Sequence, residues 1–252
     1  MRAVLGALVL AGLLVTAPAH GEDVETCAVP AYLLTTEASL TKTADAVKTR
    51  QPLNILVVGS RSSSLSGPDG ASASYPERLA VALREKLPNI TVNVTADIRP
   101  KQSTAEVSQS LQELGEKLKP TLVVWQTGTV DAIRSVDTDD FRTALDDGLG
   151  ALQKSGADVI LMNLQYSPRM ETMLSASPYI DTMRVVAQEW HVPLFDRFNI
   201  MRHWSEAGDF DLFGTAHGLG MAKRVHDCIG RALSKLVIEA AHINPAELGI
   251  QR

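Results

Sequence analysis

The chain has 252 residues with a net charge of −5, and 45% of its residues are hydrophobic while 21% are charged. These values are typical of an ordinary globular protein and exclude the disordered, collagen-like and coiled-coil classes. The 24 Lys and Arg residues face 29 Asp and Glu residues and form no basic block, so we expect no nucleic acid and no anionic membrane as a partner.

Residues 1–19 have the pattern of a secretory signal peptide. Arg2 precedes an apolar run over 3–15, and small residues follow, with cleavage expected after Ala19 or as late as Gly21. The run is too short to span a bilayer. The alternative, a buried N-terminal helix, is less favoured because acidic residues begin directly after the run. We therefore expect an exported protein, periplasmic or secreted, that has no membrane span after signal removal and a mature net charge of −6.

The two cysteines, Cys27 and Cys228, lie near the two ends of the mature chain. In an oxidising compartment an even pair is more often bridged than free. We therefore predict a disulfide between them, with two unrelated thiols as the alternative.

From residue 53 onward, short aliphatic runs alternate with longer amphipathic segments. The aliphatic runs predict strands over 53–58, 90–94, 121–125, 157–162 and 192–195. The amphipathic segments predict helices over 76–87, 104–118, 138–155, 178–190 and 222–241.

This alternation predicts an α/β fold, a three-layer, doubly wound (flavodoxin-like) parallel sheet. The near-continuous apolar character of the strands indicates that both faces of the sheet are covered. We expect an N-terminal extension over 20–52 and a single domain over 53–252. In such sheets the ligand site lies beyond the carboxyl ends of the strands.

Three sequence blocks lie at expected strand ends and before the last helix. The first strand runs into Gly59-Ser60-Arg61-Ser62, and the chain resumes in Ser74-Tyr75-Pro76. The third strand leads into Gly128-Thr129-Val130-Asp131, and His217-Gly218-Leu219-Gly220 precedes the last helix. Over about residues 53–240 these blocks resemble those of the SGNH (GDSL-type) hydrolases, which are esterases and lipases. The stretches 27–30 and 196–204 are similar to a bacterial exported branch of that family.

The resemblance implies a catalytic set that this chain has lost. The family mechanism needs a Ser nucleophile, a His base oriented by an Asp, and oxyanion donors that include a Gly N–H and an Asn side chain. The nucleophile, oxyanion Gly, Asn, Asp and base His positions fall, in that order, on Arg61, Lys101, Val130, His217 and Gly220. In a second register His217 is the base and Gly214 takes the Asp position, so the triad is incomplete in both. Substitute candidates are Ser60 and Ser62 as nucleophile and His217 as base.

Two interpretations of the altered site remain open. In one, Arg61, Lys101 and His217 converge with Gly128 near the N-terminus of the first helix and bind a small anionic or carbohydrate ligand. In the other, Arg61 pairs with Asp131 or Asp97 and fills the site. No two His residues have metal-ligand spacing, so we expect no metal and no cofactor.

The sequence therefore favours an exported, non-catalytic pseudoenzyme of the SGNH-hydrolase fold that binds a ligand or has a structural role. The alternative is an ester hydrolase for small acyl or acetylated-carbohydrate substrates with a rewired Ser/His site. A third interpretation is a scaffold that uses only the surface of the fold in the cell envelope.

Overall fold

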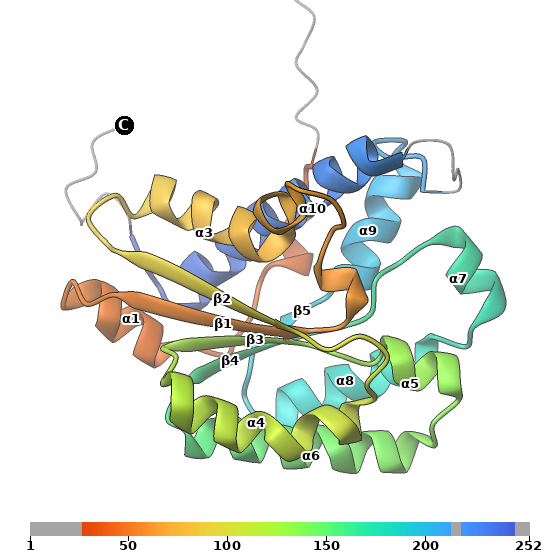
Figure 1. The fold of residues 1–252 in the computed structure, drawn as a ribbon, viewed down its shortest axis with the longest axis horizontal. Coiled ribbons are helices and arrows are strands. Elements are labelled where there is room, and N and C mark those ends of the chain that lie inside the picture. Colours follow the sequence, from red (N-terminus) through yellow and green to blue (C-terminus); the bar gives the residue numbers. More distant parts are fainter. Residues whose placement is uncertain (1–26, 213–217, 245–252) are drawn as a thin grey trace, which may run out of the picture.

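The computed structural model describes residues 27–212 and 218–244. Its centre is a parallel sheet with the strand order β2-β1-β3-β4-β5 (Figure 1). This is the order of flavodoxin-like sheets, so the predicted fold class is confirmed. The strands are β1 (Leu53–Gly59), β2 (Val92–Ile98), β3 (Leu122–Gln126), β4 (Asp158–Met162) and β5 (Leu194–Phe195).

Helices cover both faces of this sheet, which gives three layers (Figure 1). Above it in the view lie α3 (Tyr75–Lys86), α9 (Arg197–Glu206) and α10 (Gly218–Ala240). Below it lie α4 (Thr104–Leu118), α6 (Thr138–Lys154) and α8 (Ser177–Glu189). The five predicted helices are present, with ends that differ by at most four residues. The shorter elements are η1 (Ala31–Leu33), α1 (Thr41–Lys48), η2 (Arg61–Ser63), α2 (Gly70–Ala73), α5 (Thr129–Arg134) and α7 (Pro168–Met173).

Strand β2 extends four residues beyond the predicted end at residue 94. The strand lies at the edge of the sheet, and its second half holds Thr95 and Ala96, which are exposed, and Asp97, which pairs with Arg99 at 2.8 Å. A criterion based on apolar runs fails here, because an edge strand needs no continuous apolar sequence. The extra residues carry the chain to the carboxyl edge of the sheet, beside the end of β1.

The N-terminal extension is attached to the body of the protein. Leu40 and Val47 of the α1 region are buried in the core, and the Leu40 N–H donates to the Ala240 carbonyl at 2.9 Å. Cys27 and Cys228 form the predicted disulfide, with their Cα atoms 5.3 Å apart. Among the described residues, no helix has the length and apolar character needed to cross a membrane.

We expect the disulfide to stabilise the fold strongly, because it joins residues 201 positions apart. In the chain-entropy model, closing a loop of this length contributes about 5 kcal/mol. The double variant Cys27→Ser/Cys228→Ser should therefore unfold at clearly lower urea concentration than the oxidised protein, and wild type reduced with dithiothreitol should behave like the variant. Oxidised wild type should show no thiol on titration in denaturant. An unchanged urea midpoint, or the titration of two thiols, would contradict the expectation.

Candidate functional site

At the carboxyl ends of β1 and β3, a serine-rich loop over residues 60–66, here called the serine loop, lies against one buried amide. Gln126, the last residue of β3, is 3% exposed, and its Oε1 accepts hydrogen bonds from the Ser60 N–H and the Ser60 hydroxyl, both at 2.9 Å. The hydroxyl of Ser63, which is fully buried, donates to the same oxygen at 3.0 Å. A Cβ atom on Gly59 would lie 2.2 Å from the Ser63 Oγ, so only glycine fits at the end of β1. The Gln126 side chain therefore holds the loop that follows β1.

A buried arginine contacts this loop. Arg197, the first residue of α9, is 1% exposed, and its Nη1 and Nη2 donate to the Ser62 Oγ at 3.1 Å and to the Ser62 carbonyl at 3.0 Å. Its guanidinium lies 5.6 Å from the centre of the Tyr75 ring. Burial lowers the pKa of Arg197 to about 10, so the group stays charged at neutral pH. In the described part of the chain no carboxylate pairs with it, and the Ser62 hydroxyl, the Ser62 carbonyl and the Tyr75 ring are the groups around this cation.

A histidine completes the buried cluster. His226 of α10 is 6% exposed, and its Nδ1 accepts a hydrogen bond from the Tyr75 N–H at 3.0 Å. The Tyr75 hydroxyl in turn bonds to the Ser63 Oγ at 2.9 Å. Burial, and then the charge of Arg197, lowers the pKa of His226 to about 3, so the imidazole is neutral at physiological pH.

The sequence analysis assigned no role to Gln126, Arg197 or His226. Arg197 carries a usable signal, since Asp196 and Arg197 are charged residues in an otherwise largely apolar stretch directly after a strand. A cation in such an apolar run at the carboxyl edge of a parallel sheet points to a buried polar cluster. Gln126 and His226 have no comparable signal, because their contacts come from distant parts of the chain.

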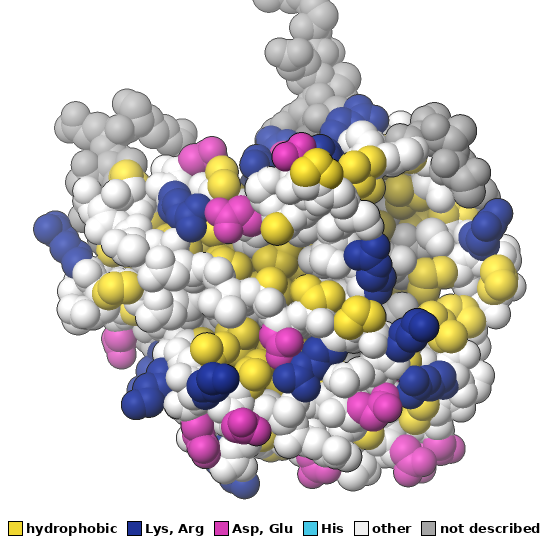
Figure 2. Space-filling view, viewed as in Figure 1, with side chains coloured by type: hydrophobic (Ala, Val, Ile, Leu, Met, Phe, Trp, Pro, Cys, Tyr) yellow, Lys and Arg dark blue, Asp and Glu magenta, His cyan; other side chains and the backbone are white. Residues whose placement is uncertain are grey.

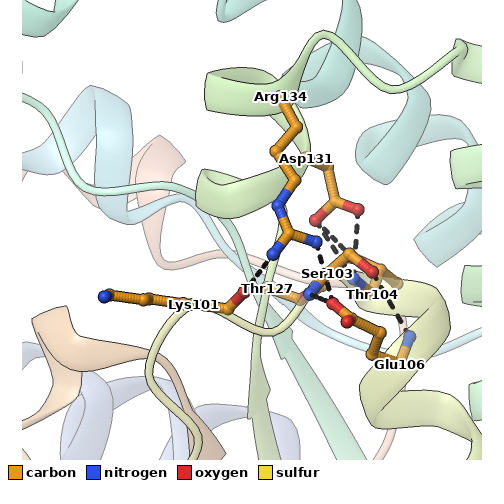
Figure 3. Close-up of polar contacts among 7 residues, drawn as sticks. All are labelled: Lys101, Ser103, Thr104, Glu106, Thr127, Asp131 and Arg134. Atoms are coloured by element: carbon orange, nitrogen blue, oxygen red, sulfur yellow. Dashed lines mark hydrogen bonds and ion pairs between the residues drawn. The ribbon is translucent and has the colours of Figure 1, made fainter.

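A second polar cluster anchors the loop after β2 (Figure 3). Asp131 of α5 is 1% exposed and accepts from the N–H and the hydroxyl of Thr104, at 3.0 and 2.8 Å. The Thr104 Oγ1 also lies 2.6 Å from the Thr127 Oγ1. These contacts fix the first turn of α4 against α5, so Asp131 has a structural role in this arrangement.

Lys101 belongs to this loop through its backbone. Arg134 donates to the Lys101 carbonyl at 2.7 Å and to the Glu106 carboxylate at 2.9 Å. Hydrogen bonds from Ser103, together with Arg134, hold the pKa of Glu106 below its usual range. Lys101 has a φ of 66°, and its exposed side chain leads away from the cluster (Figure 3).

Arg61 is exposed and bonds within its own loop, donating to Ser64 at 3.1 Å and to Ser66 at 2.5 Å. It pairs with neither Asp131 nor Asp97, so Arg61 does not fill the site by an internal ion pair. Arg61 opens the three-residue helix η2, whereas the long helix α3 begins at Tyr75. Arg61 therefore lies in a separate short helix that precedes the first long helix. The segment 64–74, which contains only the four-residue helix α2, separates the two, because its polar and glycine-rich sequence does not continue a longer helix.

The other substituted positions lie on two helices. Gly128 precedes α5 with a φ of 89°, and a Cβ atom there would lie 2.8 Å from the Leu164 Cδ1. Val130 lies in the first turn of α5 and has no side-chain donor. Gly220 lies in the first turn of α10, where a Cβ atom would meet nothing within 4 Å. His217 lies outside the described residues, so its convergence with Arg61, Lys101 and Gly128 stays a prediction.

The crevice between the ends of β1 and β3 is almost completely filled. Gly59, Ser60, Gln126, Gly128 and Val130 contribute to its walls, and its cavity volume is about 10 Å³. This is room for about one water molecule. In the described ranges, no three His, Cys, Asp or Glu side chains are grouped in a way that could hold a metal ion.

Gln126 should be important for stability, because its removal leaves polar groups of the serine loop without a hydrogen-bond partner. We expect Gln126→Met to lower the free energy of unfolding by at least about 2 kcal/mol, since each buried polar group left without a partner costs about 1–3 kcal/mol. Gln112→Met, on the exposed face of α4, is the matched control and should change stability by less than about 0.5 kcal/mol. Urea unfolding of the three proteins measures both values, and equal effects of the two substitutions would refute the role of the Gln126 amide.

His226 should make the stability depend on pH. In the unfolded chain the imidazole binds a proton below about pH 6.5, whereas in the folded protein it does so only near pH 3. The unfolded state therefore binds more protons in this window, and the free energy of unfolding falls by about 1.4 kcal/mol per unit as the pH is lowered.

The variant His226→Asn keeps an acceptor for the Tyr75 N–H and cannot titrate. Between pH 6 and pH 4 its free energy of unfolding should fall less steeply than that of wild type, by the equivalent of one proton. Urea unfolding at four or five pH values measures the two slopes, and parallel slopes would show that His226 is not the group responsible.

Comparisons with known proteins agree on the family and the fold. A model of the Non-GDSL lipase-like family matches residues 26–243. A search among curated proteins found no match. Similar solved structures include the lipase/acylhydrolase from Enterococcus faecalis, with a TM-score of 0.59 and 18% identity over 74% of this chain and 95% of that one. The esterase EstA from Pseudoalteromonas sp. has a TM-score of 0.56 and 16% identity, over 73% of this chain and 96% of that one. TesA has a TM-score of 0.55 and 21% identity, over 73% of this chain and 99% of that one. The resemblance to the SGNH (GDSL-type) hydrolases is thereby confirmed.

Proposed function

The chain belongs to the Non-GDSL lipase-like family, and from this premise we propose that it is a non-catalytic pseudoenzyme with the SGNH-hydrolase fold. A shared fold does not by itself carry an activity, so the proposal depends on the chemistry of the site.

The observation that carries the proposal is the set of partners around the two candidate nucleophiles. A nucleophilic serine needs a base within hydrogen-bond reach to take its proton. The hydroxyls of Ser60 and Ser62 lie 3.2 Å apart, and their other partners are the Gln126 amide oxygen and the Arg197 guanidinium. An amide oxygen is not a base at neutral pH, and the guanidinium is already protonated. His226 is committed to the Tyr75 N–H instead.

The oxyanion side of the site supports the same conclusion. Val130 stands at the Asn position and has no hydrogen bond to donate, and the loss of one oxyanion donor lowers the rate by about 10²- to 10³-fold. The crevice of about 10 Å³ is also far smaller than the roughly 300–1,000 Å³ of typical ligand pockets. An acyl group has no space in this crevice as the described residues form it.

We also propose that the protein is exported to the periplasm or to the outside of the cell. The apolar run over 3–15 supports export, and so does the disulfide between Cys27 and Cys228, because such bonds persist in oxidising compartments.

The second candidate function is ester hydrolysis through Ser62 and His217. One observation favours it, since Ser62 is only half-buried and lies at the carboxyl edge of the sheet, close to where the family places its nucleophile. It requires the His217 imidazole to reach the Ser62 hydroxyl.

The two functions are separated by an activity assay. We expect wild type to hydrolyse p-nitrophenyl acetate and butyrate no faster than the triple variant Ser60→Ala/Ser62→Ala/His217→Ala, because no group among the described residues is positioned to activate either serine. Ser108→Ala, on the surface of α4, is the control for the loss of a hydroxyl elsewhere. A tenfold lower rate in the triple variant alone, or covalent labelling of Ser62 by a fluorophosphonate, would establish hydrolysis and overturn the pseudoenzyme proposal.

A further inference from the structure

A larger cavity lies away from the serine loop, between α2, α3 and α10 and next to the disulfide. Its volume is about 490 Å³, within the range of small-molecule sites. Its lining has no residue in common with the filled crevice at the ends of β1 and β3. A ligand here is therefore independent of the proposed loss of hydrolysis.

The charged groups around this cavity are unbalanced. Four cations line it, and two carboxylates oppose them: Arg78, Lys223, Arg224 and Arg231 against Asp69 and Asp227. Asp227 is shared, because Arg78 lies 2.5 Å and Arg231 2.8 Å from its oxygens. One carboxylate thus compensates two guanidinium groups and leaves one positive charge in excess.

The remaining two cations are less well compensated. Lys223 lies 3.6 Å from Asp69, whose side chain is 72% exposed, so solvent weakens this pair. Within residues 27–212 and 218–244, no carboxylate pairs with Arg224. Its guanidinium lies 5.7 Å from the centre of the Phe210 ring. The cavity therefore has an excess of positive charge although the protein as a whole is acidic.

The cavity also has an ordered apolar part. Phe210 is 3% exposed and packs edge-on against the buried Trp204, with ring centres 5.8 Å apart. The Cys27–Cys228 disulfide forms another part of the wall. Figure 2 shows Lys and Arg side chains beside hydrophobic ones at the top of the molecule, where α10 lies in Figure 1. A fixed ring, a covalent bridge and paired arginines make a wall that needs little ordering on binding.

From this combination we propose that the cavity binds a small organic anion with an apolar body, such as a carboxylate attached to a short hydrocarbon or aromatic group. The acid group lies against Lys223 and Arg224, and the apolar body lies against Phe210 and the disulfide. A free inorganic anion lacks the second contact, and a neutral amphiphile lacks the first.

The test uses the full mature protein and the fluorescent probe 8-anilinonaphthalene-1-sulfonate, an anion with an apolar body. Titration should give saturable binding that octanoate displaces, whereas inorganic phosphate and octyl glucoside at the same concentration do not. Displacement by phosphate alone would show a site for charge only, and equal displacement by octyl glucoside would show an apolar surface. Either result overturns the proposal.

The decisive variant is Lys223→Gln/Arg224→Gln, which removes two cations and leaves the Arg78–Asp227–Arg231 group intact. Its affinity for the probe should be at least tenfold lower. Lys117→Gln/Lys154→Gln changes the net charge equally on the other face of the sheet and should bind as wild type does. Equal affinities in the two variants would refute the site. Should the first variant fail to fold, Ser72→Trp, which fills the cavity without a change in charge, must abolish binding, and full binding by it refutes the site as well.

Discussion

The carboxyl edge of the sheet depends on the side chain of Gln126. Two parallel strands, β1 and β3, end side by side, and the loop after β1 leaves the sheet with polar groups that need partners. The Gln126 oxygen satisfies the Ser60 N–H and the hydroxyls of Ser60 and Ser63 together. Because an unsatisfied buried polar group is costly, this one amide determines the path of the loop and thereby where the remaining side chains of the site lie.

Arg197 has the second role in that arrangement. A buried cation normally requires a carboxylate, yet here the Ser62 backbone and hydroxyl and the Tyr75 ring surround the guanidinium. These contacts fix the position of Ser62 and join α9 to the start of α3. Burial, and then this positive charge, lowers the pKa of His226 and keeps its imidazole neutral, so His226 takes part in packing.

Two of the cavities among the described residues differ greatly in size. The crevice at the strand ends has a volume of about 10 Å³, whereas a cavity of about 490 Å³ lies between α3 and α10. The layers of the fold depend on buried aliphatic residues in the strands and helices. These are different residues from those of the site, so the site can change while the layers remain. Likeness to esterases at 16–21% identity is therefore likeness of the framework.

The sequence by itself determined the layers, the long helices and the disulfide. Apolar runs such as 53–58 and 121–125 are local signals, and each of two cysteines has only the other as a partner within the chain. It also predicted an incomplete family catalytic set, because Arg61 and Val130 can be identified from the blocks that contain them.

Only the tertiary structure decided what occupies the site. Gln126 and Arg197 contact the serine loop, and His226 contacts Tyr75, from positions 66 to 151 residues away, and no periodicity indicates such contacts. The direction of a side chain is equally hidden, since Arg61 bonds to its own loop and the Lys101 side chain is exposed. Secondary structure follows from local periodicity, whereas a polar cluster follows from which distant donors and acceptors must satisfy one another once they are buried.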